Sequence, residues 1–284
     1  MNITLQHCSA QHPAKHNSAR DSSSPTLRDL SLTVTHGEQL AVIGPSGAGK
    51  TTLLLTLACA LKPSGGVLHI NDSNPWALPA VGLSKLRGQL FLAPQVPPLP
   101  PRQRVVTAVL AGRLPHESLW ASVRSLFYPT DIALAELALG QFDMADKLFE
   151  RVDRLSGGER QRVGLARALA SQAKLFLVDE PLSALDPTRA EQAIESLTTA
   201  AQARGATLVA TLHHVEMALR HFPRIIGLRG GSLAFDLPAV EVTPEHLHQL
   251  YDQHLGELTG TTPHTNDDSF AEPLAARPVA MQCR

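Results

Sequence analysis

One eight-residue segment limits what this chain can fold into more than any other feature of the sequence. Residues 44–51 read Gly-Pro-Ser-Gly-Ala-Gly-Lys-Thr, a complete G-x-x-x-x-G-K-[ST] phosphate-binding loop. The run 39–43 before it is apolar with β-branched residues and predicts a buried strand, while the apolar run 50–61 after it predicts a helix. A strand, a glycine-rich loop and a helix in this order form a unit that places phosphate at a helix N-terminus.

Each part of this loop has a chemical task. Glycines let the backbone approach closely, so that successive N–H groups can surround a β-phosphate. Lys50 reaches the β- and γ-phosphates, and the Thr51 hydroxyl is placed to bind Mg²⁺. By itself the loop indicates nucleotide-phosphate binding, which GTPases, kinases, helicases and transporters share. The residues expected to contact the nucleotide here are Gly44, Pro45, Ser46, Gly47, Ala48, Gly49, Lys50, Thr51 and Thr52.

Length, charge and composition describe an ordinary globular protein. A chain of 284 residues predicts one large domain, or one domain with a subdomain and a tail. With 25 basic and 26 acidic residues the net charge is −1, so the chain has no electrostatic footprint for nucleic acid, and we expect no nucleic-acid partner. Hydrophobic residues make up 43% of the chain, which excludes collagen-like and fully disordered classes.

The sequence predicts neither a membrane span nor a secretory leader. Its longest nearly uninterrupted apolar run, 53–61, is far shorter than the roughly 20 residues that a spanning helix needs. The first seven residues lack the charged and apolar regions of a signal peptide. Cys8, Cys59 and Cys283 lie far apart and without zinc-ligand spacing, which is typical of a reducing compartment. We therefore expect a cytoplasmic protein.

Strand and helix patterns alternate along much of the chain. Besides 39–43, strands are expected near 3–7, within 26–35, at 175–178 and at 207–211. Strands separated by helices imply an α/β core with a mainly parallel sheet.

The middle and the end of the chain depart from this alternation. Between about 84 and 170, a cluster of prolines is followed by helical patterns at 105–114 and 132–149, which predicts a helical subdomain inserted in the core. Residues 252–284 lose periodicity and aromatic content, so we expect a disordered tail after a unit of residues 1–251.

A pair of carboxylates follows one of the expected buried strands. Asp179 ends the apolar run 175–178, the position from which a carboxylate holds the water shell of Mg²⁺ opposite a phosphate loop. Glu180 follows directly and can align and polarise an attacking water. The pair therefore predicts a division of work between metal binding and hydrolysis.

A second anion site is indicated by Ser156, Gly157, Gly158 and Glu159, at the start of a helical run through Ala170. The serine can donate its hydroxyl, and the two glycines let the backbone lie against phosphate oxygens. One phosphate loop and one further site of γ-phosphate type in the same chain suggest that the second site serves another copy.

Together these motifs resemble the ATP-binding subunits of ABC transporters, and the resemblance covers roughly residues 3–251. It implies a P-loop NTPase of the α/β class with a mainly parallel core sheet, an N-terminal antiparallel β part and the helical insertion. The segment 155–159 matches the family signature, and Ser183-Ala184-Leu185-Asp186 resembles the loop that communicates across a head-to-tail dimer.

The resemblance also assigns roles to individual residues. Gln95, within 91–95, corresponds to the glutamine that senses Mg²⁺ and the membrane partner. His213 corresponds to the switch histidine, and the neighbouring His214 is the competing candidate. The catalytic residues implied in this way are Lys50, Glu180 and His213, and the metal-binding residues are Thr51, Gln95 and Asp179.

Two segments depart from the family pattern. The position that usually carries an adenine-stacking aromatic ring corresponds best to His12, whose imidazole offers a smaller face, and the extra loop 14–24 follows it. Prolines crowd the residues around and after Gln95, and because proline fixes φ this segment is expected to be stiff. One interpretation is a surface loop that tolerates proline, and the other is a stiff loop that transmits nucleotide state to a membrane subunit.

Weaker similarities indicate one subfamily of these ATP-binding subunits. Segments 109–114, 118–120, 126–127, 211–220 and 224–229 are similar to phosphonate-type importer ATPases. The implied function is ATP hydrolysis that energises a membrane importer, with phosphonate or a related oxyanion as the expected cargo.

The implied cofactors are ATP and Mg²⁺, and the implied partners are a second copy arranged head to tail, integral membrane permease subunits and, indirectly, a solute-binding protein. Such a subunit would sit peripherally on the cytoplasmic face of the cell membrane. The alternative is a soluble ABC ATPase that acts as an accessory or regulator of an enzyme complex. Co-purification with a membrane-embedded partner or with a soluble assembly separates the two.

Overall fold

Two β-sheets organise the part of the chain that the computed structural model describes, residues 1–11, 26–127 and 131–252. The larger sheet has six strands in the order β5-β6-β7-β3-β8-β9. Neighbouring strands in it are parallel except for β8 and β9, which form an antiparallel pair. Its strands are β3 Gln39–Ile43, β5 Leu90–Ala93, β6 Leu175–Asp179, β7 Thr207–Thr211, β8 Arg224–Arg229 and β9 Ser232–Pro238.

The smaller sheet is built mainly from the N-terminal part of the chain. Its three strands run antiparallel in the order β2-β1-β4, with bounds β1 Ile3–Ala10, β2 Leu27–Val34 and β4 Gly65–Ile70. The expected fold class, a mainly parallel core sheet with an N-terminal antiparallel β part, is therefore confirmed.

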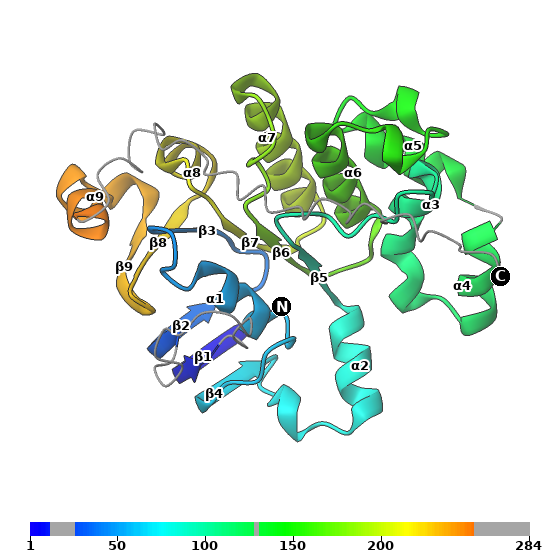
Figure 1. Cartoon of the computed structure of the whole chain (residues 1–284). Helices are drawn as coiled ribbons and strands as arrows, with labels where there is room; N and C mark the ends of the chain where they lie inside the picture. The colour runs from blue at the N-terminus through cyan, green and yellow to red at the C-terminus, as the bar shows by residue number, and fades with distance from the viewer. Residues whose placement is uncertain (12–25, 128–130, 253–284) are drawn as a thin grey trace, which may run out of the picture.

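The core sheet is covered on both faces, because its central strands β3, β6 and β7 are mostly apolar and are buried at nearly every position. Successive side chains of a strand point to opposite faces. Leu40 and Val42 of β3 accordingly join a cluster formed with α1 and the small sheet, whereas Ala41 and Ile43 join a cluster formed with α6, α7 and α8. In Figure 1 α1 lies with the small sheet below the core sheet, and α6, α7 and α8 lie above it.

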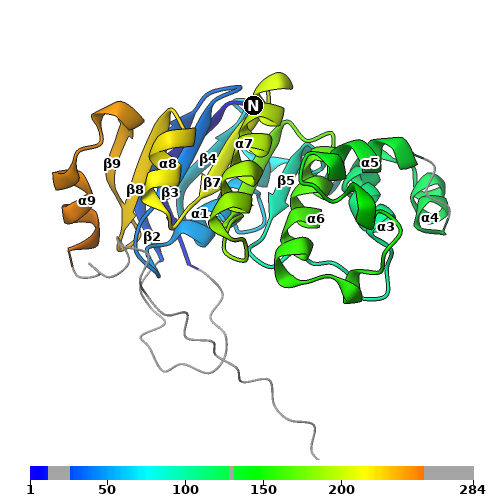
Figure 2. The same ribbon diagram turned by 90° about the horizontal axis from the view of Figure 1, so that it is seen from above.

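The helices are short apart from two that flank the core sheet, α6 and α7. In Figure 2 α3, α4 and α5 gather beyond β5 at one end of the molecule, and α9 lies beyond β9 at the other. Within the described residues no helix combines the length and apolar character that crossing a bilayer requires. The helices are α1 Lys50–Leu57, α2 Ala80–Gly88, α3 Val105–Leu110, α4 Leu119–Phe127, α5 Ile132–Gly140, α6 Gly157–Ala170, α7 Pro187–Ala203, α8 Val215–His221 and α9 Pro244–Tyr251.

The segment expected to form a helical insertion, about 84–170, contains one strand of the core sheet. β5 pairs with β6 in parallel, and the helices α3, α5 and α6 that follow pack against one another through residues such as Val109, Leu139 and Leu165. The short strand β5 precedes the prolines and was hidden by them in the sequence pattern. The division into a cassette, an insertion and a tail stays a prediction, and residues 253–284 lie outside the described part.

Two helices end earlier than the apolar patterns predicted. The helix expected over 50–61 ends at Leu57, and Cys59 then has a positive φ of 54°. The helix expected over 132–149 ends at Gly140, and Asp143 has a φ of 52°. Positive φ interrupts a right-handed helix, while the side chains beyond remain apolar because the turns themselves pack into the core.

Candidate functional site

The phosphate loop connects the end of β3 to the start of α1 and requires glycine at its two ends. A Cβ atom at Gly44 would lie 2.1 Å from the carbonyl oxygen of Leu228 in β8. Gly49 has a φ of 102°, and a Cβ there would lie 2.9 Å from a methyl carbon of Leu27. Both positions therefore exclude larger residues by close backbone approach or by conformation.

Lys50 lies against the backbone of its own loop. Its Nζ donates to the carbonyl oxygen of Gly44 at 2.7 Å and to that of Pro45 at 3.3 Å. The side chain is buried, so these carbonyl dipoles help to stabilise its charge. The loop thus places an ammonium group and the N-terminal N–H groups of α1 together, and both favour an anion.

Asp179 at the end of β6 uses both carboxylate oxygens. The Thr51 hydroxyl donates to Oδ2 at 2.8 Å, and the Thr211 hydroxyl donates to Oδ1 at 2.6 Å. Asp179 and Thr211 are partners in the parallel register of β6 and β7. Thr211 was not expected as a site residue. Its only sequence signal was its place at the end of a buried strand, since the carboxyl ends of parallel strands meet at one edge of a sheet.

The Asp179 and Thr51 side chains fit the donor set of a magnesium ion. Mg²⁺ prefers carboxylate, hydroxyl and water oxygens, and a carboxylate oxygen and a hydroxyl oxygen lie 2.8 Å apart here. Gln95, the third expected ligand, lies instead beside the neighbouring carboxylate of Glu180.

Glu180 is held by side chains from two other segments. Gln95 Nε2 donates to its Oε2 at 2.7 Å, and His213 Nε2 lies 2.5 Å from its Oε1. Its backbone has a φ of 46° and donates its N–H to the Thr211 hydroxyl. Positive φ in a non-glycine residue is uncommon and occurs often at functional sites. The carboxylate is therefore fixed next to Asp179 at the carboxyl edge of the sheet.

Of the two candidate histidines, the structure places His213 against Glu180. His214 instead occupies the N-cap position of α8 without a side-chain capping bond. A residue that sequence reasoning did not single out also reaches this point, since Gln161 Nε2 of α6 lies 3.4 Å from the backbone oxygen of Glu180.

Ser156 to Glu159 form the first turn of α6 as a closed capping box. Glu159 N–H donates to Ser156 Oγ at 3.2 Å, and Ser156 N–H donates to Glu159 Oε2 at 2.7 Å. Hydrogen bonds from the Ser156 backbone and side chain lower the pKa of Glu159, so it is charged at neutral pH. A Cβ at Gly158 would lie 2.8 Å from the Ala184 carbonyl oxygen, so this turn packs on segment 183–186.

The chain does not bring this turn to its own phosphate loop. α1 packs on one face of the core sheet and α6 belongs to the cluster on the other face (Figure 1). The expected nucleotide contacts are thus divided between two places. His12, the expected adenine-stacking residue, lies outside the described residues.

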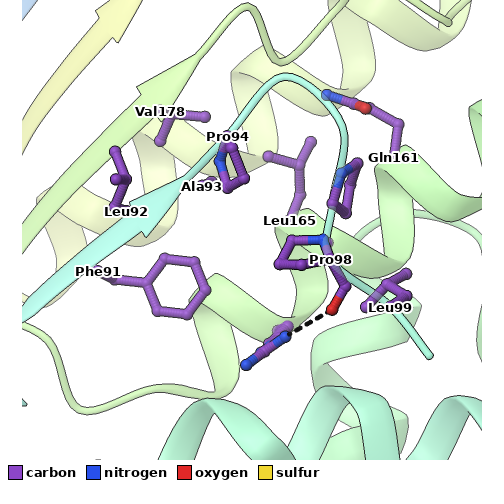
Figure 3. Close-up of a pocket in the computed structure, with 12 residues that line it drawn as sticks. Phe91, Leu92, Ala93, Pro94, Pro98, Leu99, Gln161, Leu165 and Val178 are labelled. Atoms are coloured by element: carbon purple, nitrogen blue, oxygen red, sulfur yellow. Dashed lines mark hydrogen bonds between the residues drawn. The ribbon is translucent and has the colours of Figure 1, made fainter. Parts of the chain in front are cut away.

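Pro97 and Pro98, which follow Gln95, lie against α6. We call residues 94–101 the proline loop. A Cβ at Gly164 would lie 2.7 Å from Pro97 Cγ, and Arg167 Nη1 lies 3.5 Å from the carbonyl oxygen of Pro98. Figure 3 shows that Phe91 and Pro98 face a small pocket here, and its volume is about 90 Å³. The loop that carries Gln95 is therefore in contact with the helix that carries Ser156.

Comparison with known proteins places this geometry in a family. Residues 27–183 match the family model described as ABC transporter. This chain belongs to the ABC transporter family. Phosphonates import ATP-binding protein PhnC 2 of Albidiferax ferrireducens is 71% identical over 284 residues, which is all of both chains. Phosphonates import ATP-binding protein PhnC of a Polaromonas species is 67% identical over 285 residues, again over both full lengths.

Solved structures of ABC cassettes share the fold. The dimeric structure of MJ0796, a bacterial ABC transporter cassette, is 26% identical with a TM-score of 0.69, and the match covers 84% of this chain and 98% of that one. A dimeric post-hydrolysis state of MJ0796 bound to ADP and Pi is 25% identical with a TM-score of 0.68 and the same coverage. As an ABC ATP-binding protein, this chain binds and hydrolyses ATP.

Proposed function

We propose that this chain is the ATP-hydrolysing subunit of an ABC importer for phosphonates or a related oxyanion. The observation that carries the hydrolytic part is Glu180, whose carboxylate is fixed by Gln95 and His213 beside the Asp179–Thr51 pair. The cargo rests on the phosphonate-import names of relatives that are 71% and 67% identical over the full chain.

In the proposed mechanism the chain's own groups bind the nucleotide and direct a water. The phosphate loop N–H groups and Lys50 hold the β- and γ-phosphates, and Lys50 exchanges its carbonyl partners for phosphate oxygens. Glu180 aligns the attacking water and polarises it, and His213 holds that geometry at the γ-phosphate. Mg²⁺, held by Thr51 and Asp179 with Gln95 nearby, would supply neutralising positive charge on the phosphates.

We infer a head-to-tail dimer in which each ATP site uses two copies. The phosphate loop and Glu180 come from one copy, and the turn Ser156 to Glu159 comes from the other. Two features support this arrangement: the turn lies on α6, away from the chain's own phosphate loop, and the MJ0796 cassette structures are dimeric. Hydrolysis then removes the bridging phosphate and lets the dimer open, which is the movement that a membrane partner uses.

We infer further that the dimer works at the cytoplasmic face of the cell membrane with integral permease subunits, to which a solute-binding protein delivers cargo. The proline loop would carry the nucleotide state from Gln95 to the permease. The alternative of a soluble accessory ATPase has no support among the compared relatives, which are named import proteins.

Transport by the assembled system tests the cargo. The chain is expressed with the permease and solute-binding subunits of a phosphonate importer, and ATP-dependent accumulation of a phosphonate is measured in membrane vesicles. We expect accumulation that stops when Lys50→Ala replaces the native chain, and competition by phosphate or sulfate measures which related oxyanions the system accepts. Isolation of the chain in a soluble assembly without any permease would favour the accessory role instead.

A further inference from the structure

Residues near the C-terminal end of the described chain contact the phosphate loop. Gly44 lies against the carbonyl oxygen of Leu228, and Gly231 N–H donates to the Ala48 carbonyl oxygen at 3.1 Å. β8, which carries Leu228, pairs in parallel with β3, so both strands end at the loop. The C-terminal elements therefore form one wall of the nucleotide site.

Tyr251 adds a hydrogen bond to the first residue of the loop. The Gly44 N–H donates to the Tyr251 hydroxyl oxygen at 3.1 Å, although 207 positions separate the two residues. Tyr251 is only 1% exposed and is the last residue of α9. A buried backbone N–H without an acceptor is costly, so this hydroxyl meets a requirement of the loop.

α9 is anchored where it can hold Tyr251 in place. Leu250 is buried in the same cluster as Tyr251, and Arg229 of β8 donates to the carbonyl oxygen of Gln249. At its start, Thr243 and His246 form a capping box, and the His246 ring lies 5.6 Å from that of Phe235 in β9. Figures 1 and 2 both show α9 at the β8–β9 end of the core sheet.

Gly44 connects Tyr251 to a group that is expected to contact phosphate. Its N–H donates to Tyr251, and its carbonyl oxygen accepts from Lys50 Nζ at 2.7 Å. The Gly44 backbone therefore links the Tyr251 hydroxyl to the start of the loop, and it contacts the Lys50 ammonium until phosphate oxygens take its place. Losing the hydroxyl would let this backbone turn, and the loop would spend part of its time in conformations that hold phosphate less well.

We propose that Tyr251 is a positioning residue for nucleotide binding, which acts through the Gly44 backbone and makes α9 part of the ATP site. The ligand class is a nucleoside di- or triphosphate, because the loop that Tyr251 orders is the one proposed to hold the β-phosphate. This inference rests on the proposed use of the phosphate loop. It adds to the ATP site a residue that lies far along the chain from the loop, from the carboxylate pair and from the turn at α6.

The test is Tyr251→Phe in the full chain, which keeps the ring and removes only the hydroxyl. Dissociation constants for ATP and ADP are measured by calorimetry, together with KM, kcat and Tm. We expect both dissociation constants and the KM for ATP to rise about two- to tenfold, the effect of losing one buried hydrogen bond, while kcat at saturating ATP changes less than twofold.

Leu250→Val is the matched control, because it weakens the packing of α9 by one methylene and keeps the hydroxyl. We expect its Tm to fall while its nucleotide affinity stays within twofold of the native value. Unchanged affinity in Tyr251→Phe overturns the proposal, as does an equal loss of affinity in both variants in proportion to Tm. If the native chain itself fails to bind nucleotide, the proposed function fails, and that result is separate from either outcome.

Discussion

At the scale of single residues, the site depends on contacts between positions far apart in the chain. Glu180 meets Gln95 and His213, and the Thr211 hydroxyl bonds both Asp179 and the Glu180 N–H. Thr211 thus fixes the Asp179 carboxylate and the Glu180 backbone at once, and of these two residues one is proposed to hold metal and the other to direct water. Its small hydroxyl suits this place because it both donates and accepts.

Glu180→Gln tests the proposed role of the carboxylate in hydrolysis. An amide cannot accept the proton of the attacking water, so kcat is expected to fall about 10²- to 10⁴-fold while ATP binding and dimerisation persist. Steady-state phosphate release, ATP calorimetry and size-exclusion chromatography measure the three properties. Glu191→Gln, a surface carboxylate that pairs with Arg220 and His221, is the control and should keep the native rate. A native rate in Glu180→Gln would remove Glu180 from the mechanism.

At the scale of elements, the proline loop connects the two parts of the proposed site. It contains Gln95, which contacts Glu180, and its Pro97 packs on Gly164 within α6. α6 in turn begins with the Ser156 capping box. Each proline fixes its own φ and restricts the residue before it, so the loop has few conformations in which to absorb a displacement.

Replacing Pro97, Pro98, Pro100 and Pro101 with alanine is expected to separate ATP hydrolysis from transport. The loop would gain conformational freedom, so a displacement at Gln95 would no longer reach the permease, while the hydrolytic residues remain unchanged. Hydrolysis and uptake are measured together in reconstituted vesicles, and the number of ATP molecules used per solute should rise severalfold. Pro63→Ala, between α1 and β4, is the control. Native coupling in the quadruple variant would show that the prolines are only tolerated.

At the scale of the whole molecule, one chain contains two incomplete halves of the proposed site on different faces of its core sheet. The proposed head-to-tail dimer completes them. Because such a dimer has two equivalent sites, each of which takes one half from each copy, it permits a test by mixing inactive variants.

Lys50→Ala and Ser156→Arg should each abolish hydrolysis alone and restore it together. In a mixed dimer one site carries both changes and the other carries neither, so an equal mixture is expected to regain about a quarter of the native rate. The control is the mixed dimer of the double variant Lys50→Ala/Ser156→Arg with the native chain, purified away from native homodimers by two different affinity tags, because it has no intact site. Failure of the two single variants to complement each other would contradict the head-to-tail arrangement.

A cluster of charges between the strands is expected to give stability a dependence on pH. Arg224 of β8 donates to Glu38 at 2.6 Å and to Asp236 of β9 at 2.6 Å. Burial by itself would raise the pKa of Glu38, but hydrogen bonds from the Thr35 N–H, Arg224 and the Thr35 hydroxyl outweigh it, so this pKa lies below its ordinary value of 4.5. The cluster joins the turn before β3 to the far edge of the sheet.

A lowered pKa means that Glu38 stabilises the folded chain fully above pH 4.5 and loses this effect as the pH falls through its folded pKa. Glu38→Gln should therefore reduce the free energy of unfolding by about 1–2 kcal/mol at pH 7, and the difference from the native chain should shrink below pH 4.5. Urea unfolding of both chains at pH 7 and at a pH below 4.5 measures this difference in the free energy of unfolding. Glu136→Gln on α5 is the control, and a difference that stays constant with pH would contradict the assignment.

The sequence indicated much of this architecture because several motifs combine local geometry with local chemistry. The phosphate loop, the carboxylate pair and the turn at α6 each occupy consecutive residues, so their spacing alone shows them. The strands β3, β6 and β7 were visible as apolar runs for the same reason. β4 and β5 are short and lie beside glycines or prolines, which concealed their pairing with distant strands.

What the sequence determined by itself was the family, the mainly parallel core and the residues of each local motif. The tertiary structure decided which of these residues meet. It brought His213, rather than His214, to Glu180, joined the Thr211 hydroxyl to the Asp179 carboxylate and the Glu180 N–H, and placed the Tyr251 hydroxyl on Gly44. These contacts depend on the register of parallel strands and the docking of α9. Such pairings join residues tens to hundreds of positions apart, and no local pattern records them.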